Sequence, residues 1–537
     1  MAFKVLSRCL GMSPSRKASG CYSCQRHTFH VISSDRNGCD QSKESSPFHW
    51  AEQGRQQKKQ QGVGRDRRVR RLQQTKQPHR TALVQQKDSQ PGHKERPGAK
   101  QTQKYVALPM QHPERTDPDS FLAELALCGS PRSCLTLSRK SWRQWHNAGY
   151  RVSEDTAEFA PSAETAAATL RIIANLATPR PLAERVSLAR EPFIQGLTRT
   201  LADAGIDRRN SLRELSPKVV ASGVWSIASL AGPYLYMEEM ETMLQLCNFS
   251  GEVLEPAETA DLLWGLGTSR HLSARMYAVD QAASREGGLS CFGPEDLSPT
   301  LWGFATLGVC PALLVSTLPV AWVNDKGPLD GSPACTPSDL TAPQLTTAAW
   351  ALVVMGQSDS PPLNALWVEL CERGPHKLRG KHNLLRIHQV AMSLDLESQT
   401  PARKRHPKAG RLMAAARHAW MSDSGDLRSK RGSHLHREIA AAVRRLGLPA
   451  LEESSLPGYS VDITIPSMNM VLEADGPSHF NRTTGDALGS TLLKHRLLKA
   501  MGWNVLSIRL DDWEELIGPE ERQSFLKSLF GGATSNA

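Results

Sequence analysis

The sequence PKVVASGVWSI, residues 217–227, contains the pattern from which we predict the architecture of this chain. A proline is tolerated in the first turn of a helix, because its missing N–H would have no partner there anyway. Trp225 follows Pro217 by eight residues, so it falls about two turns into such a helix. The residues around it are apolar. We therefore predict a helix that begins at the proline and packs its tryptophan against a neighbour.

The same pattern recurs downstream. A proline precedes a tryptophan by seven or eight residues in three further segments: Pro256 and Trp264, Pro294 and Trp302, and Pro343 and Trp350. Successive tryptophans are 39, 38 and 48 residues apart. A fifth copy at residues 383–394 has His388 in place of the tryptophan, and residues 166–177 form a degenerate earlier copy. A unit of ~38 residues accommodates one helical hairpin, and stacked hairpins bury each other's apolar faces. We predict an α-solenoid of helical-hairpin repeats over residues 116–400.

This repeat resembles the octotricopeptide repeat of algal organelle proteins, whose members bind RNA. The resemblance covers about residues 160–395 and consists of the period and the short tryptophan-centred signature. We interpret each tryptophan as a buried packing residue. The resemblance implies that side chains that read RNA lie on the concave face of the repeats.

The last hundred residues show the pattern of a compact α/β unit. Residues 434–446 have helical apolar spacing, and residues 459–465 alternate between apolar and polar side chains, as in a half-buried strand. A turn-like segment separates this strand from a second one at residues 470–475. Residues 492–501 are predicted to be helical, and residues 504–510 to be a third strand.

Several sequence blocks of this unit are similar to the RAP domain, an RNA-binding domain abundant in apicomplexans. In order, they are Val461-Asp462-Ile463, LEADGPSHF at residues 472–480, Lys494, Gly502-Trp503 and Trp513. We assign the domain to residues 432–532. The resemblance implies an RNA-binding factor of mitochondria or chloroplasts that acts in transcript processing, stability, splicing or translation, behind helical repeats.

The same strands also resemble the restriction-endonuclease-like fold. In its active members an Asp on one strand and a Glu on the next bind a divalent cation, and a Lys two positions after the Glu supports the attacking water. Asp462 and Glu473 match the first two positions and are the candidate metal ligands, but Asp475 stands where the lysine is expected. Lys494 could replace that lysine, and Glu438 on the first predicted helix of the unit could add a ligand. An Mg²⁺-dependent RNA endonuclease that uses Asp462, Glu473, Asp475 and Lys494 is therefore the alternative to a non-catalytic protein without a cofactor.

Positive charge is concentrated in two parts of the chain. Residues 1–104 contain 22 Lys and Arg against 7 Asp and Glu, and residues 377–445 contain 16 against 5. Such clusters are typical of proteins that bind polyanions. We predict a basic linker of mixed character at residues 401–431, with a short helix at residues 412–420 inside it. The candidate RNA-binding residues are Arg403, Lys404, Arg405 and Lys408 in this linker, with His479 and Lys494 in the RAP-like unit.

The N-terminus has the composition of a targeting segment. No acidic residue precedes Asp35, and the first 34 residues contain basic residues, serines and a short apolar face, as mitochondrial and chloroplast transit peptides do. We predict a transit peptide at residues 1–40, a disordered Gln/Lys/Arg-rich segment at 41–115, and a location in the mitochondrial matrix or the chloroplast stroma. No run reaches the ~18 apolar residues of a membrane-spanning helix, so we expect no membrane insertion.

Together these patterns predict an RNA-binding organellar factor. Its expected partners are single-stranded organellar RNA and ribonucleoproteins or other RNA-processing proteins. Besides the endonuclease, a second alternative is a protein-only scaffold, because solenoids commonly bind proteins. The chain outside the basic tail has a net charge of −4, which is compatible with that alternative.

Overall fold

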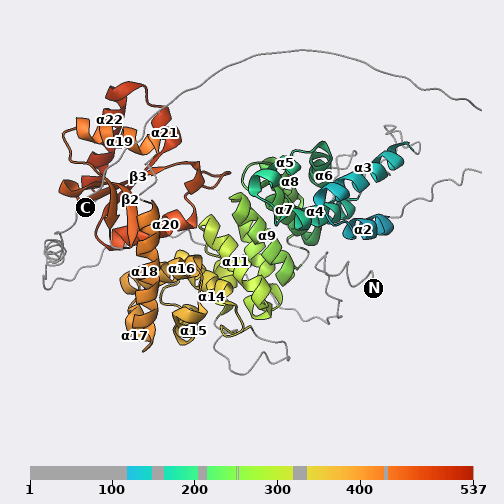
Figure 1. Cartoon of the computed structure of the whole chain (residues 1–537), viewed down its shortest axis with the longest axis horizontal. Coiled ribbons are helices and arrows are strands. Elements are labelled where there is room, and N and C mark those ends of the chain that lie inside the picture. Colours follow the sequence, from blue (N-terminus) through green and yellow to red (C-terminus); the bar gives the residue numbers. More distant parts are fainter. Residues whose placement is uncertain are drawn as a thin grey trace, which may run out of the picture. The chain divides into compact units, whose positions relative to one another are not determined.

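The computed structural model describes residues 118–147, 162–203, 214–249, 251, 253–318, 335–427, 433–456 and 458–535. The described chain is mostly helical and has a small mixed sheet near its C-terminus (Figure 1). The predicted transit peptide at 1–40 and the predicted disordered segment at 41–115 both lie outside these ranges. Within the ranges, no helix is both long and apolar enough to cross a membrane.

The elements before the sheet are all helices. They are α2 (Pro118–Ala126), α3 (Pro131–Asn147), α4 (Ala163–Ala177), α5 (Leu182–Ala189), α6 (Pro192–Asp203), α7 (Pro217–Ala231), α8 (Met237–Leu246), α9 (Pro256–Ser269), α10 (Met276–Ala283), η2 (Arg285–Cys291), α11 (Pro294–Leu307), α12 (Ala312–Ser316), α14 (Ala342–Val354), α15 (Pro361–Lys377), α16 (Lys381–Glu397), α17 (Ala402–Arg405) and α18 (Ala409–Leu427).

The C-terminal elements alternate between helices and strands. They are α19 (His434–Arg445), β1 (Leu451–Leu456), β2 (Tyr459–Ile465), η3 (Pro466–Met468), β3 (Met470–Asp475), η4 (Pro477–His479), α20 (Gly489–Ala500), β4 (Asn504–Arg509), α21 (Leu510–Glu514) and α22 (Gly518–Ser535). Both predicted helices and all three predicted strands of this unit are confirmed. The edge strand β1 and the last helix, α22, were not predicted.

The prolines of the repeat begin helices, as predicted. Pro217, Pro256 and Pro294 are the first residues of α7, α9 and α11, and the Ser216 side chain accepts a hydrogen bond from the third residue of α7. A capping box closes the start of α14, where Thr341 exchanges hydrogen bonds with the third residue of the helix. Local capping and proline geometry therefore define where these helices start.

The helices that begin in this way pack against one another in chain order. Helix α4 packs on α7, α7 on α9, α9 on α11, α11 on α14, and α14 on α16. Two glycines permit the closest approaches: a Cβ added at Gly303 of α11 would lie 2.3 Å from the Leu263 carbonyl oxygen of α9, and one at Gly265 would lie 2.8 Å from the Val224 side chain. Each of these glycines directly follows a repeat tryptophan.

The repeat position in α16 differs from our prediction. Counted from the first residue of each helix, the ninth position holds Arg171 in α4, a tryptophan in α7, α9, α11 and α14, and Gln389 in α16. Trp350 Nε1 donates to Gln389 Oε1 at 2.9 Å. His388, predicted at this position, packs on Trp420 of α18 with ring centroids 5.0 Å apart. The spacing of 38 residues from Trp350 points to His388, which lies one residue before the ninth position of α16. Consecutive side chains of a helix point about 100° apart, so this difference of one residue selects a side chain on another face.

Residues 401–431 do not form a simple linker. Residues 402–405 and 409–427 are helices α17 and α18, and α18 packs along α15 and α16. Ala402, Ala409, Leu412 and Ala416 are fully buried in this contact. The described part of the segment therefore continues the helical stack, because its small apolar residues cover the last predicted repeat.

The sheet has the order β1-β2-β3-β4, in which β3 and β4 are parallel and the other neighbours are antiparallel. Ile463, Leu472 and Ile508 share one buried core with α19 and α22. Helix α20 lies between the sheet and the helical stack: Leu493 and Leu497 belong to the large core that the stacked helices form.

Candidate functional site

Three carboxylates meet on one face of the sheet. The antiparallel register pairs Ile463 with Leu472 and Thr464 with Val471, so Asp462 on β2 lies opposite Glu473 on β3. Asp475 follows two residues later and points to the same side. Asp462 Oδ2 also accepts a hydrogen bond of 2.8 Å from the Ala474 N–H. The predicted grouping of Asp462, Glu473 and Asp475, called here the carboxylate cluster, is present.

Glu473 is as deeply buried as Asp475, with 3% of each residue exposed. Lys494 Nζ from α20 donates to Glu473 Oε2 at 2.7 Å, and Oε1 has no hydrogen-bond partner among the described residues. Burial raises the pKa of Glu473 to about 8; Lys494 opposes this rise, whereas Asp462 and Asp475 add to it. Burial and carboxylate repulsion outweigh the lysine, so Glu473 is mainly protonated at neutral pH.

Asp475 is held by three neighbours. Ser507 Oγ on β4 donates to Asp475 Oδ2, and His479 Nδ1 lies 3.3 Å from Oδ1. His495 Nε2 lies 3.9 Å from Oδ2, and burial lowers the pKa of that histidine. The Asp475 carboxylate therefore connects β3 to β4, to the following turn and to α20.

The predicted metal ligands Asp462 and Glu473 lie together, and Lys494 stands beside Glu473. Across the described ranges, no three His, Cys, Asp or Glu side chains are placed so that they could hold a metal ion. Lys494 Nζ pairs with Oε2 of Glu473, the carboxyl predicted as a metal ligand. Glu438 of α19 lies elsewhere, because it accepts from Trp513 Nε1 at 3.1 Å and pairs with Arg522 at 3.3 Å.

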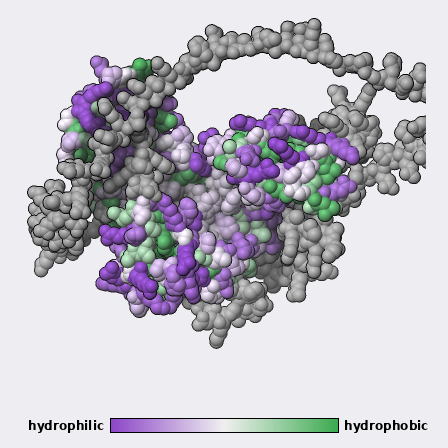
Figure 2. Space-filling model, in the orientation of Figure 1, coloured by the Kyte–Doolittle hydropathy of each residue, from purple (hydrophilic) through white to green (hydrophobic). Residues whose placement is uncertain are grey.

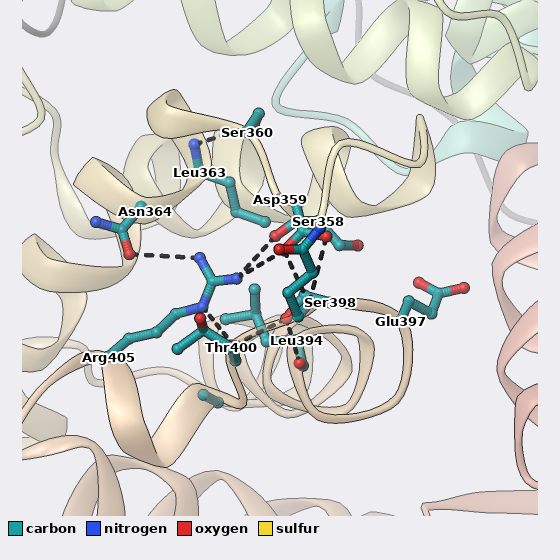
Figure 3. Close-up of polar contacts among 12 residues, drawn as sticks. Ser358, Asp359, Ser360, Leu363, Asn364, Leu394, Glu397, Ser398, Thr400 and Arg405 are labelled. Carbon is teal, nitrogen blue, oxygen red and sulfur yellow. Dashed lines mark hydrogen bonds and ion pairs between the residues drawn. The ribbon is translucent and has the colours of Figure 1, made fainter.

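Arg405, a predicted RNA-binding residue, is a structural residue (Figure 3). Its side chain is only 6% exposed. The guanidinium donates to the Thr400 carbonyl at 2.8 Å, the Ser358 carbonyl at 3.2 Å and Asn364 Oδ1 at 3.3 Å, and it pairs with Asp359 at 3.4 Å. Its role as an RNA ligand is therefore corrected: it joins α17 to the segment before α15, and its donors are already used.

The remaining predicted cations of this segment are exposed. Arg403 and Lys404 are exposed on α17, and a Cβ added at Gly410 would lie 4.0 Å from Arg403 Nε, which places α17 beside the start of α18. Lys408 pairs with Glu372 at 2.5 Å across two half-exposed side chains. The next exposed cation, Arg411 on α18, was missed because the sequence window did not show which basic residues face outward. We call Arg403, Lys404, Lys408 and Arg411 the basic surface.

Hydrophilic residues cover the region of α15 and α17 on the face drawn in Figure 2. Of the two RNA-binding candidates in the C-terminal unit, His479 has a half-exposed side chain, whereas Lys494 is used by Glu473. The structure therefore separates the predicted candidates into accessible residues and residues held by structural contacts. The accessible ones are Arg403, Lys404, Lys408 and His479, and the held ones are Arg405 and Lys494.

Comparison with known proteins identifies the C-terminal unit. Residues 472–529, from β3 to the last helix, match the family described as RAP domain. A chloroplast protein of Oryza sativa subsp. japonica, named RAP domain-containing protein, is 25% identical over 352 residues, which are 60% of this chain and 53% of the relative. The chain thus spans about half the length of that relative. The strand that bears Glu473 and Asp475 is the first element of the matched region, and the chain carries a RAP domain at its C-terminus.

Proposed function

We propose that this chain binds single-stranded organellar RNA and acts in post-transcriptional gene expression. The observation that carries the proposal is the match of residues 472–529 to the RAP domain. The basic surface on α17 and α18 supports it, because exposed cations next to one another suit a phosphate backbone. The chloroplast relative supports an organellar location.

We infer further that the stacked helices form an α-solenoid of the octotricopeptide type. Arg171 on α4 passes over the Trp225 ring of α7, 3.8 Å from its centroid, and donates to Asp261 on α9 at 2.6 Å. A side chain reaches two helices away only where the helices converge, so the ninth-position residues lie on the concave side of this part of the stack. This is the side where the repeat family is expected to meet RNA.

The repeat tryptophans themselves support packing and not base stacking. The Trp225 ring lies between Arg171 and Trp264, whose ring centroid is 5.8 Å away. Trp350 is 8% exposed and donates its indole N–H to Gln389. Arg171 lies over the Trp225 ring and Trp350 is buried, whereas Trp225, Trp264 and Trp302 remain partly exposed. A base stacks on a free ring face, and these contacts favour packing. We therefore assign RNA contacts to the exposed cations and polar side chains around the tryptophans.

The test is the salt dependence of RNA binding by the full chain. The double variant Arg403→Ala/Lys404→Ala should weaken binding to every single-stranded RNA to a similar degree. The slope of log affinity against log salt should become shallower by up to ~0.7 per lost contact. Arg132→Ala/Lys140→Ala on α3 removes the same two residue types from another exposed surface and should leave affinity and slope unchanged. Equal losses in both variants would contradict the assignment.

The same preparation distinguishes the alternatives. Labelled RNA incubated with Mg²⁺ or Mn²⁺ should be retained and remain intact, because Lys494 already pairs with the Glu473 carboxyl. Metal-dependent cleavage that is abolished by Glu473→Gln would favour the endonuclease. Failure to retain RNA would favour a protein-only scaffold.

The location has its own test. Residues 1–60 fused to a fluorescent protein should direct it to mitochondria or chloroplasts, because this segment begins with basic and serine residues and without acids. The organelle that fluoresces decides between the two. A diffuse cytosolic signal would contradict the organellar proposal.

A further inference from the structure

A pocket of about 310 Å³ lies at the edge of the sheet where the parallel strands β3 and β4 end. Its walls include Asp475 and Arg509, the last residues of these strands, with Phe480, Asn481 and Arg482 from the following loop. In α/β sheets, ligands bind outside the carboxyl ends of parallel strands. The volume is at the small end of ligand pockets, about 300–1,000 Å³.

Two polar groups of the wall are buried and have no partner within the described structure: Asn481 Oδ1 and Arg509 Nε. Asn481 is 2% exposed, and its Nδ2 donates to the carbonyls of Leu307 at 3.2 Å and Asp486 at 3.3 Å. Because both neighbouring groups are carbonyl acceptors, the amide nitrogen must face them. Oδ1 is therefore the amide atom that has no hydrogen-bond partner. Two residues of the wall therefore carry an unsatisfied acceptor and an unsatisfied donor.

The loop that closes the pocket is held in place by the helical stack. The Arg482 N–H donates to the Arg270 carbonyl at 2.8 Å, and Thr483 Oγ1 exchanges hydrogen bonds with the backbone of Leu272 at 2.7 and 3.0 Å. These contacts involve backbone atoms or Thr483, so the exposed Arg482 side chain is not needed for them. The pocket wall is thus preorganised, and Arg482 can be replaced without removing its support.

The charges of the pocket are mixed. Arg509 Nη1 donates to the Gly485 carbonyl at 2.9 Å, and its guanidinium lies 4.4 Å from the Phe480 ring centroid. Burial lowers the pKa of Arg270; Tyr234 opposes this shift, and the like charge of Arg482 adds to it. An anion beside Arg482 would relieve this like-charge repulsion. Asp475 in the same wall instead favours a hydrogen-bond donor, so inorganic phosphate alone would satisfy only part of the pocket.

We propose that this pocket binds one nucleotide unit of RNA, with a donor edge of the base on Asn481 Oδ1 and Asp475 and the phosphate on Arg482 and Arg509. The inference rests on the proposed RNA-binding function and specifies a site for it. A ribonucleotide combines the required features: an anionic phosphate, a flat apolar surface that suits Phe480, and base N–H groups that suit buried oxygen acceptors.

The experiment measures binding of the four ribonucleoside 5′-monophosphates and of inorganic phosphate to the full chain by calorimetry. At least one nucleotide should bind, and phosphate should bind at least about tenfold more weakly, because it cannot reach Asn481 and Phe480 together. Arg482→Ala should weaken nucleotide binding by about tenfold, the usual scale for a charge-assisted contact. Arg437→Ala removes an exposed arginine from α19, outside the pocket, and should change nothing. Both variants should melt like the wild type.

Three results would contradict the proposed nucleotide site: no nucleotide binds, phosphate binds as well as nucleotides, or Arg437→Ala has the same effect as Arg482→Ala. If the protein retains long RNA but binds no mononucleotide, the nucleotide site is contradicted and the proposed RNA-binding function stands. Conversely, the protein could bind mononucleotides, with weaker binding in Arg482→Ala, and yet retain no long RNA. This result would support the nucleotide site and contradict the RNA-binding function. A short RNA that displaces the bound mononucleotide would support both.

Discussion

Glu473 and Arg405 are both ionisable side chains inside the protein, and the fold accommodates them in opposite ways. Arg405 stays charged because two carbonyls, an amide oxygen and Asp359 surround its guanidinium. Glu473 has one cationic partner, Lys494, and two carboxylate neighbours, so burial shifts it toward the neutral form. The number of compensating partners, more than burial itself, decides which form is stable.

Glu473→Gln should change how stability depends on pH. The pKa of Glu473 is raised from 4.5 to about 8, so the folded protein holds this proton more tightly than the unfolded chain. The stabilisation is complete below about pH 4.5 and is lost as the pH rises through about 8. The Gln variant keeps a neutral side chain at every pH. Its melting temperature, relative to wild type, should therefore increase from pH 5 to pH 8; parallel curves would show that Glu473 is already ionised.

Arg405→Ala should destabilise the protein by about 1–3 kcal/mol, because it removes a largely buried side chain together with its hydrogen bonds and its ion pair. Arg403→Ala, two residues earlier and exposed, should stay within about 0.5 kcal/mol of wild type. Urea unfolding of both variants measures the difference. Reversed effects would place Arg405, and not Arg403, on the RNA-binding surface.

At the scale of elements, the helices of the stack approach closely because glycine follows tryptophan. Gly265 and Gly303 lie against the preceding helix, where a Cβ would collide with Val224 or with the Leu263 carbonyl. The tryptophan covers the neighbouring helix while the glycine lets the backbones meet. The Trp-Gly pair therefore acts as a packing unit. Helix packing accounts for both residue types at these positions, and no ligand is needed to explain them.

Gly303→Ala tests this packing. Alanine favours a helix over glycine by about 1 kcal/mol, but here its Cβ would lie 2.3 Å from a backbone oxygen. Overpacking of this kind costs typically 1–3 kcal/mol, so the variant should be less stable. Gly196→Ala in α6 has no atom within 4 Å of the new Cβ and should be more stable by about 0.5–1 kcal/mol. Stabilisation by both changes would show that α9 and α11 are not in close contact.

At the scale of the whole described molecule, the RAP domain is attached to the C-terminal ends of stacked helices. Arg496 of α20 donates to the carbonyls of Val353 and Val354 in the last turn of α14, and it pairs with Glu397 at the end of α16. Such carbonyls have no partner within their own helix, and a cation there also suits the helix dipole. At Gly489 a Cβ would lie 1.8 Å from the Ala305 carbonyl of α11.

Arg496→Ala should loosen the RAP domain from the helical stack. We expect unfolding to change from one transition toward two, and faster hydrogen exchange in α20 and at the end of α14, because the helix-end carbonyls lose their donor. Lys499→Ala, an exposed residue on the same helix, should leave both measurements unchanged. A single unshifted transition for Arg496→Ala would show that apolar contacts alone hold the domain.

Local periodicity determined much of this protein from sequence alone. Proline at a helix start and tryptophan two turns later predict the repeat helices, since both effects act within one helix. The period of two in a strand placed Asp462 and Glu473 on a common face once the turn between their strands was recognised. The RAP resemblance identified the C-terminal unit for the same reason: its motif is continuous along the chain.

Only the tertiary structure decided which side chains remain available. Arg403 and Arg405 are indistinguishable in sequence. Arg403 is exposed, whereas the Arg405 guanidinium donates to residues on α15 and on the segment before it. Lys494 pairs with Glu473 only because α20 packs across the sheet. Gln389, and not His388, contacts Trp350, because the residue at which each helix begins decides which side chains face the neighbouring helix. These outcomes depend on contacts between residues tens of positions apart, whose geometry the packing of whole elements defines and no local pattern records.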